Sequence, residues 1–263
     1  MHDLGFIFAG FVVGLVIGLT GVGGGSLMTP ILVFFFGVKP YLAVGTDLLF
    51  AAFTKFGGTL RLARARVIDW RIVAHLSAGS IPAALTTLAI LNRLDPASSA
   101  VQGLMTRTLG AALLLTAAAT LYKVVRGKVL PVALAPGQEG RAATPRHWSL
   151  PLVLGAVVGT LVTLTSVGAG AIGVSVLLII YPMLPLPRIV AADIAYAVPL
   201  TLVAGFGHAS LGSVDWPLLA LLLTGSLPGI WLGSHLMNRL NERVIRSTLS
   251  ALLAWAGSKL IAI

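Results

Sequence analysis

Three ionisable side chains lie inside long apolar stretches of this sequence. Asp47 and Lys55 belong to one stretch, and Asp193 belongs to another. An ionisable residue at the centre of a membrane helix costs at least about 2.5 kcal/mol, so it usually faces a cavity or a partner. Asp47 and Lys55, about two helical turns apart, could share a broad face. They predict either a structural ion pair or a working pair, in which a carboxylate carries a proton beside an anion-binding lysine.

Glycine-rich sequence interrupts two of the apolar stretches, at Gly21–Ser26 and at Ser166–Gly170. Non-helical backbone at membrane depth is tolerated only where it is buried in protein or lines a cavity. Helix N-termini and glycine-rich nests favour anions, so the two breaks are expected to frame an anion site. Ser26 is the expected N-cap of the helix that follows the first break, with Pro30 in its first turn.

The candidate site residues fall into two groups. Donors and one cation for substrate binding are Thr20, Gly21, Gly23, Gly24, Gly25, Ser26, Lys55, Thr165, Ser166, Gly168 and Gly170. Candidate proton-coupling residues are Asp47, Asp193 and His208. A histidine can titrate near neutral pH, but near a helix end it is more often a polar cap. No constellation suits catalysis or metal binding, so neither an enzyme nor a cofactor is expected.

The composition of the sequence indicates the class of protein to which these residues belong. Of the 263 residues, 57% are hydrophobic and only 10% are charged, whereas soluble domains carry roughly 25% charged residues. Several nearly uncharged stretches of about 18 residues or more are long enough to cross a bilayer as helices. The net charge of +10 comes largely from basic residues in short loops, which is typical of membrane topology rather than nucleic-acid binding. The prediction is an all-α polytopic membrane protein.

The apolar segments form two similar series around a basic linker. They are Leu4 to Phe36 with its break, Tyr41 to Leu60, Ile72 to Leu91 and Ala100 to Val125, then Leu150 to Leu184 with its break, Ile189 to Ala209, Trp216 to Met237 and Val244 to Ile263. Asp69-Trp70 recurs as Asp215-Trp216, and Gly-Ser-x-Pro at 79–82 recurs at 225–228. Ordered matches at one offset predict a repeat at 1–125, a linker at 126–148 and a second repeat at 149–263.

Loop charges then predict that the repeats are inverted. The loop after the second segment holds four arginines, namely Arg61, Arg64, Arg66 and Arg71. Its counterpart at 208–215 holds no Lys or Arg. Matched loops of opposite charge bias should face opposite sides of the membrane. Inversion requires each broken segment to form a hairpin, followed by three spanning helices. The linker is then cytoplasmic, and both termini lie outside.

The two halves differ at the predicted site. Asp193 matches Asp47, but Thr201 stands where the first half has Lys55. This asymmetry favours Asp193 as the proton carrier and Lys55 as the anion ligand. The ladder Gly10, Gly14 and Gly18 has a different expected role, because glycines four residues apart permit close helix packing.

Four motifs together resemble the sulfite exporter TauE/SafE family, also called the toluene sulfonate uptake permease family. They are GLTGVGGGS at 18–26 followed by Pro30, AVGTDL at 43–48, VIDWR at 67–71 and GHASLGSVDW at 207–216. The resemblance covers nearly the whole chain. It implies a secondary transporter of sulfur-containing anions in a bacterial inner membrane, and its motifs include both breaks and the segments of Asp47 and Asp193. The chain departs from symmetry at His208, because Leu62 stands at the matching position.

The predicted function is secondary transport of small oxyanions, such as sulfite or organosulfonates, by alternating access and rocking of the two halves, with a proton as the candidate coupling ion. A carboxylate exporter for lactate-like or dicarboxylate anions would use the same parts, and a passive anion channel would need no titrating carboxylate. The expected partners are the small anionic substrate and the lipid bilayer, with a homodimer left open and no nucleic acid.

Overall fold

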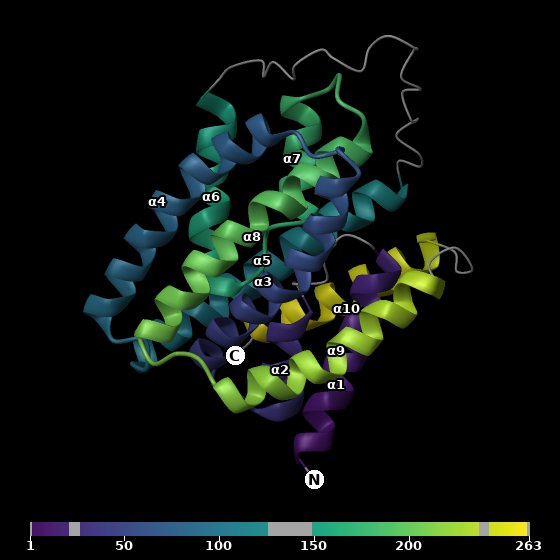
Figure 1. Cartoon of the computed structure of the whole chain (residues 1–263). Helices are drawn as coiled ribbons and strands as arrows, with labels where there is room; N and C mark the ends of the chain where they lie inside the picture. Colours follow the sequence, from purple (N-terminus) through teal and green to yellow (C-terminus); the bar gives the residue numbers. More distant parts are fainter. Residues whose placement is uncertain (1, 21–26, 126–148, 237–241, 262–263) are drawn as a thin grey trace.

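A computed structural model describes residues 2–20, 27–125, 149–236 and 242–261 (Figure 1). These residues form ten helices and no strand. The helices are α1 (His2–Thr20), α2 (Met28–Phe36), α3 (Pro40–Arg64), α4 (Trp70–Leu94), α5 (Ser99–Val125), α6 (Ser149–Thr165), α7 (Ala171–Ile180), α8 (Leu186–Ser210), α9 (Trp216–Leu236) and α10 (Glu242–Ile261). The all-α prediction is confirmed.

The order of long and short helices recurs. Helices α1 to α5 have 19, 9, 25, 25 and 27 residues, and α6 to α10 have 17, 10, 25, 21 and 20. Four of them, α4, α5, α8 and α9, contain apolar windows long enough to cross a membrane. Helices α2 and α7 extend only about 14 and 15 Å, so neither can cross a bilayer core of about 30 Å. The broken segments therefore end in short helices, while their inverted orientation stays a prediction.

Helix starts follow local capping chemistry, with one exception. Asp69 accepts hydrogen bonds from the backbone N–H groups of Arg71 and Ile72 at the start of α4, and Asp215 accepts one from Leu218 in α9. The aspartates of the two Asp-Trp pairs thus cap the starts of α4 and α9. The predicted N-cap Ser26 is wrong, because α2 is capped at Leu27 without a side-chain hydrogen bond. A carboxylate from another helix serves this end instead, as described below.

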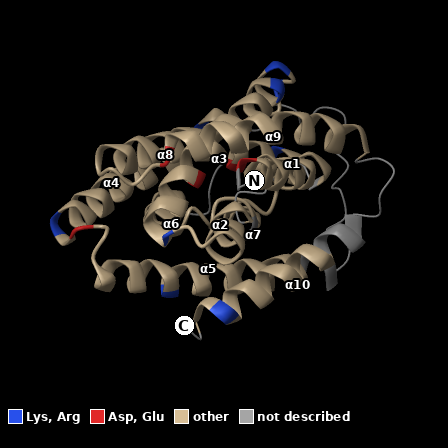
Figure 2. Cartoon of the chain, turned by 90° about the horizontal axis from the view of Figure 1, so that it is seen from below, with Lys and Arg blue, Asp and Glu red and all other residues tan. Residues whose placement is uncertain are grey.

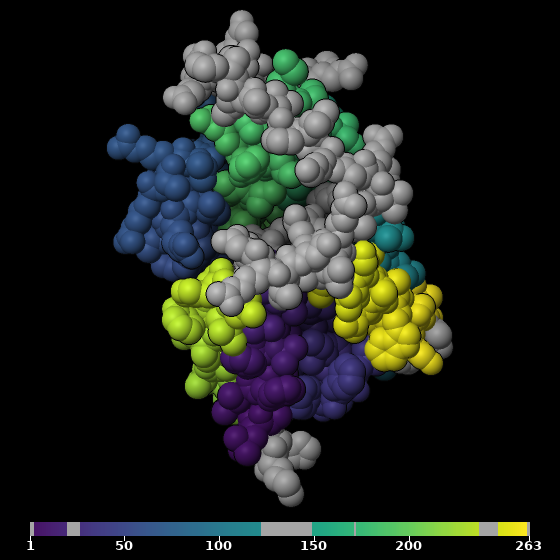
Figure 3. All heavy atoms as spheres, turned by 90° about the vertical axis from the view of Figure 1, so that its right-hand side faces the viewer, coloured from purple at the N-terminus to yellow at the C-terminus, as the bar shows by residue number. Residues whose placement is uncertain are grey.

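The two series of helices interlock rather than forming separate bundles. Helix α1 packs along α9, and its counterpart α6 packs along α4, while α3 pairs with α8 and α5 with α10. In Figure 3 the purple α1 accordingly abuts the lime α9, and the blue α4 abuts the green helices of the second series. Each series therefore contributes its fourth helix to the surface of the other.

Two buried apolar clusters reflect this exchange. The first cluster joins α4 to α6, α7 and α8. The second cluster joins α1 and α2 to α9 and α10. Helices α3 and α5 contribute side chains to both clusters. Among the described residues, charged residues are few and lie mostly towards helix ends (Figure 2).

Glycine makes the exchanged contacts possible. A Cβ atom at Gly10, Gly14 or Gly18 would meet backbone atoms of α9. On the other side, Gly155 and Gly159 of α6 lie in the same way against the backbone of α4. Backbones this close leave no room for a side chain, so the predicted packing role of the first glycine ladder is confirmed.

Candidate anion and proton site

Asp47 is fully buried on α3 and holds the start of α2. Its Oδ2 atom accepts hydrogen bonds from the backbone N–H of Thr29 at 3.2 Å and from the Thr29 hydroxyl at 2.5 Å. Thr29 is the second residue of α2, where backbone N–H groups have no partner within the helix. The helix N-terminus that the sequence offered to a substrate anion is thus occupied by a carboxylate of the protein.

The second break brings Ser166 to the same carboxylate. The Ser166 side chain is buried and faces Asp47, although its hydroxyl has no hydrogen bond of strict geometry within the described residues. Its backbone φ of 58° is left-handed, a sparsely populated conformation for a residue with a side chain. Gly168 at 133° and Gly170 at 121° continue the irregular path. The irregular backbone of the second break therefore places the Ser166 side chain towards the buried Asp47 carboxylate.

Thr165 stabilises that path from within. Its hydroxyl accepts a hydrogen bond from the Val167 N–H at 3.1 Å and lies 2.6 Å from the carbonyl of Leu161, to which it can donate. A hydroxyl has one proton to donate, and Thr165 can donate its proton to the Leu161 carbonyl. The Thr165 hydroxyl therefore stabilises the break itself.

Lys55 is buried within electrostatic range of both carboxylates. It lies two turns beyond Asp47 on α3, and only 6% of its surface is exposed. Its strongest electrostatic partner is Asp193, and the second is Asp47. The structure therefore brings together Asp47, Lys55, Ser166 and Asp193, which the sequence predicted as members of one site.

Asp193 sits against the first turn of α7, in a setting that parallels Asp47. It lies on α8 and is 2% exposed. A Cβ atom built on Gly173, the third residue of α7, would collide with its Oδ1 atom. Tyr196, one turn further along α8, is also buried within electrostatic range of this carboxylate. Each short helix thus presents its N-terminal turn to a buried aspartate, through Thr29 in one case and Gly173 in the other.

His208 lies apart from Asp193. It is buried in the last turn of α8, and its Nε2 lies 2.9 Å from the Thr163 carbonyl of α6. Fifteen residues of helix place its Cα about 22 Å from that of Asp193. This contact holds α8 against α6 three residues before Ser166. Such a structural role resembles the polar cap that the sequence offered as the alternative for His208.

The remaining predicted residues belong to the first break. Thr20 ends α1, and its side chain is not among those described. Five more lie outside the described residues altogether: Gly21, Gly23, Gly24, Gly25 and Ser26.

Sequence reasoning missed three residues of the cluster, namely Thr29, Gly173 and Tyr196. Thr29 had a signal, since it is a polar residue directly before Pro30 in an otherwise apolar helix. Tyr196 follows Asp193 by three residues and so shares its helix face. Gly173 had no signal in the sequence, because its role depends on the close contact between α7 and the Asp193 side chain of α8.

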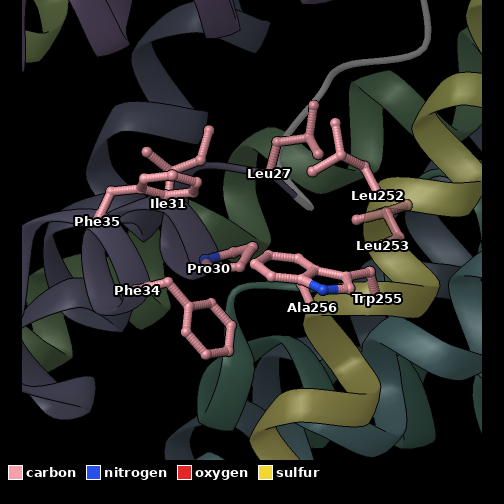
Figure 4. A pocket seen from close by; sticks show the side chains of 9 residues that line it. All are labelled: Leu27, Pro30, Ile31, Phe34, Phe35, Leu252, Leu253, Trp255 and Ala256. Carbon is pink, nitrogen blue, oxygen red and sulfur yellow. The ribbon is translucent and has the colours of Figure 1, made fainter.

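An apolar hollow between α2 and α10 is separate from this cluster (Figure 4). Leu27, Phe34 and Leu253 are among its lining residues, and the only polar side-chain atom there is the indole nitrogen of Trp255. Such a lining offers an anion no charge, so the polar cluster is the candidate site.

Comparisons with known proteins agree with a membrane transporter. A sequence profile of the family described as "Sulfite exporter TauE/SafE" matches residues 6–260. The chain belongs to the TauE/SafE family. It is also similar to two Bacillus subtilis (strain 168) proteins, both described as probable membrane transporter proteins. The first, YjnA, is 34% identical over 98% of this chain and all of its own length. The second, YunE, is 26% identical over 92% of this chain and 90% of its own.

No solved structure matches the chain. The family membership, the relatives and the four apolar spans agree that the protein is a multi-pass membrane transporter. This TauE/SafE chain therefore holds its one buried lysine and two buried aspartates, among the described residues, inside a transporter.

Proposed function

We propose that this transporter moves small oxyanions, of the sulfite or organosulfonate type, across the inner membrane together with protons. The observation that carries the proposal is the burial of Lys55 within electrostatic reach of both Asp47 and Asp193. A buried ammonium is a ligand for an oxyanion, and the two carboxylates compete with that oxyanion for the same charge.

Counting charges links anion binding to protonation. With both carboxylates ionised, Lys55 and its two partners carry a net charge of −1, which opposes entry of an anion into a low-dielectric site. One bound proton neutralises the empty cluster. A monovalent anion that joins Lys55 then requires a second proton to keep the cluster neutral. Each anion would therefore cross with about one proton, and the cycle would be electroneutral.

The substrate class follows from the chemistry of the donors and from the family. A lysine with neighbouring hydroxyl and backbone donors suits a small oxyanion, and the family is described as a sulfite exporter. The relatives are described only as probable membrane transporters. A carboxylate such as lactate or a dicarboxylate fits the same donors and is the second candidate, because it presents the same kind of oxygen atoms.

The packing supports alternating access by composite units. Helix α1 packs on α9, and α4 packs on α6, through backbones that touch at glycines. Such contacts resist separation, so each pair should move as one body. The proposed motion therefore separates the cluster containing α1 and α9 from the cluster containing α4 and α6, and does not separate residues 1–125 from residues 149–263.

The membrane arrangement is part of the proposal. The basic linker at 126–148 would face the cytoplasm, and both termini would lie outside, with the two repeats inverted. A homodimer would add no residue to the buried cluster, which one chain supplies by itself.

Counterflow of labelled sulfite in proteoliposomes tests this function. Vesicles preloaded with unlabelled sulfite, sulfoacetate, sulfate or lactate should differ in the rate at which they accumulate label, and a sulfur anion should support the fastest exchange. Lys55→Met should abolish this exchange. Arg107→Met, which removes an exposed cation from α5, is the matched control and should retain it. Faster exchange with lactate would move the substrate class to carboxylates, and uptake without any effect of preload would indicate a channel.

A further inference from the structure

Tyr196 carries a buried hydroxyl group that its packing does not explain. The side chain is 1% exposed, and its ring belongs to the first apolar cluster. The hydroxyl oxygen has no hydrogen-bond partner among the described residues. A buried hydroxyl without a partner is costly, and phenylalanine would fill the same space without that cost. The packing of the ring therefore accounts for an aromatic residue here, but not for the hydroxyl.

This hydroxyl lies beside the first turn of α7. A Cβ atom built on Gly173 would lie 3.8 Å from the Tyr196 hydroxyl oxygen, and it would collide with Oδ1 of Asp193. Two oxygen atoms from α8 thus flank one spot on α7. The N-terminal turn of a helix favours negative charge. Because a carboxylate oxygen already occupies this spot, an oxygen atom of a bound anion would have suitable surroundings in its place.

Lys55 borders the same carboxylate from another helix. Its strongest electrostatic partner is Asp193, and Tyr196 is also within electrostatic range of Asp193. An anion that takes the place of the Asp193 carboxylate would therefore lie near a charged donor from α3 and a neutral donor from α8. The neutral hydroxyl adds no charge, so the charge count of the proposed cycle stays as it is.

We propose that Lys55, the first turn of α7 and the Tyr196 hydroxyl each serve one oxygen atom of the substrate, and that Tyr196 thereby selects sulfonates over carboxylates. This inference rests on the proposed function and decides between its two substrate classes. A sulfonate carries three oxygen atoms around its sulfur atom, whereas a carboxylate carries two in one plane. A bound carboxylate would leave the hydroxyl without an acceptor, and a buried donor left unpaired lowers affinity.

Unfolding in the absence of any anion tests whether the hydroxyl is a structural group instead. Tyr196→Phe removes only the hydroxyl, and Tyr181→Phe is the matched control. Tyr181 is 3% exposed and caps the C-terminal end of α7, about 15 Å from its first turn. Tyr196→Phe should unfold at the same temperature as the wild type or higher, because no bond is lost. A larger fall in unfolding temperature for Tyr196→Phe than for Tyr181→Phe would reveal a structural bond and overturn the proposal.

Binding of two matched anions in nanodiscs tests the selectivity. Isethionate and 3-hydroxypropionate differ only in the acid group, which is a sulfonate in the first and a carboxylate in the second. Wild type should bind isethionate about tenfold more tightly. Tyr196→Phe should weaken isethionate by about tenfold and change 3-hydroxypropionate by less than about twofold, so that the preference disappears. Tyr181→Phe should match the wild type for both anions.

The possible outcomes separate this inference from the proposed function. If the wild type binds both anions and Tyr196→Phe changes neither, or weakens both equally, the proposed function stands and the role of Tyr196 is overturned. If the wild type binds neither of these anions nor sulfite, the proposed function fails, and the subsite fails with it. Gly173→Ala tests the place of the subsite and should weaken both anions, because its methyl group fills the spot. Unchanged binding in Gly173→Ala would remove α7 from the subsite.

Discussion

Replacing Gly14 by alanine should destabilise the protein through a contact between two backbones. A Cβ atom at Gly14 would lie 2.7 Å from Cα and 3.0 Å from the carbonyl carbon of Ser226. Carbon atoms in contact need about 3.5–4.0 Å, so α1 and α9 must separate locally by about 1 Å. Overpacking of this kind costs typically about 1–3 kcal/mol, and the better helix propensity of alanine offsets up to about 1 kcal/mol of it.

Gly103 provides the matched control. It lies within α5, is exposed, and has no atom within 4 Å of a Cβ built on it. Gly103→Ala should stabilise the protein by up to about 1 kcal/mol through helix propensity alone. The two alanine variants should therefore shift the unfolding temperature in opposite directions.

Thermal unfolding in detergent, followed by tryptophan fluorescence, measures this difference. A change of 1 kcal/mol shifts the midpoint by about 2–4 °C for chains of comparable length. A net cost of about 1–2 kcal/mol for Gly14→Ala thus predicts a fall of about 2–8 °C. A Gly14→Ala protein as stable as wild type, or one that matches Gly103→Ala, would refute the close packing of α1 on α9.

Three further predictions test separate parts of the account. Asp69→Ala should lower stability by about 1 kcal/mol, because the start of α4 loses its cap; an unchanged unfolding midpoint would contradict that role. Gly173→Ala should abolish proton-coupled transport while Gly103→Ala does not, because a methyl group would displace the Asp193 carboxylate; normal coupling in both variants would remove Asp193 from the site. A single cysteine at position 137, in a chain without native cysteine, should react with an impermeant reagent only from the cytoplasm, whereas one replacing His2 should react only from outside.

Much of the fold could be predicted because bilayers constrain sequence strongly. Long uncharged stretches and glycine-rich breaks predicted the order of elements in α1 to α10, with helix ends within a few residues. The exchange of α4 and α9 between the two series could not be predicted. Hydropathy reports burial of each segment but carries no information about which segment lies beside it.

The site was predictable to the extent that burial of charge is costly. Asp47, Lys55 and Asp193 were singled out because each is an ionisable group in an apolar stretch, and the structure places them together. Ser26 shows the limit of the approach. A serine after a glycine-rich break is a reasonable N-cap, but the donor groups of α2 are served by Asp47, which lies 18 residues from Thr29 in sequence. Local rules cannot anticipate a cap supplied by another helix.

Proton movement that accompanies anion movement is the most direct test of the central claim. Proteoliposomes that enclose a pH-sensitive dye should acidify when a monovalent organosulfonate is added outside, faster than protein-free liposomes and by about one proton per anion. The rate should not respond to an imposed membrane potential, because the proposed cycle is electroneutral. Anion uptake that follows the membrane potential and leaves the internal pH unchanged would contradict a carrier built on Lys55 and two exchangeable charges.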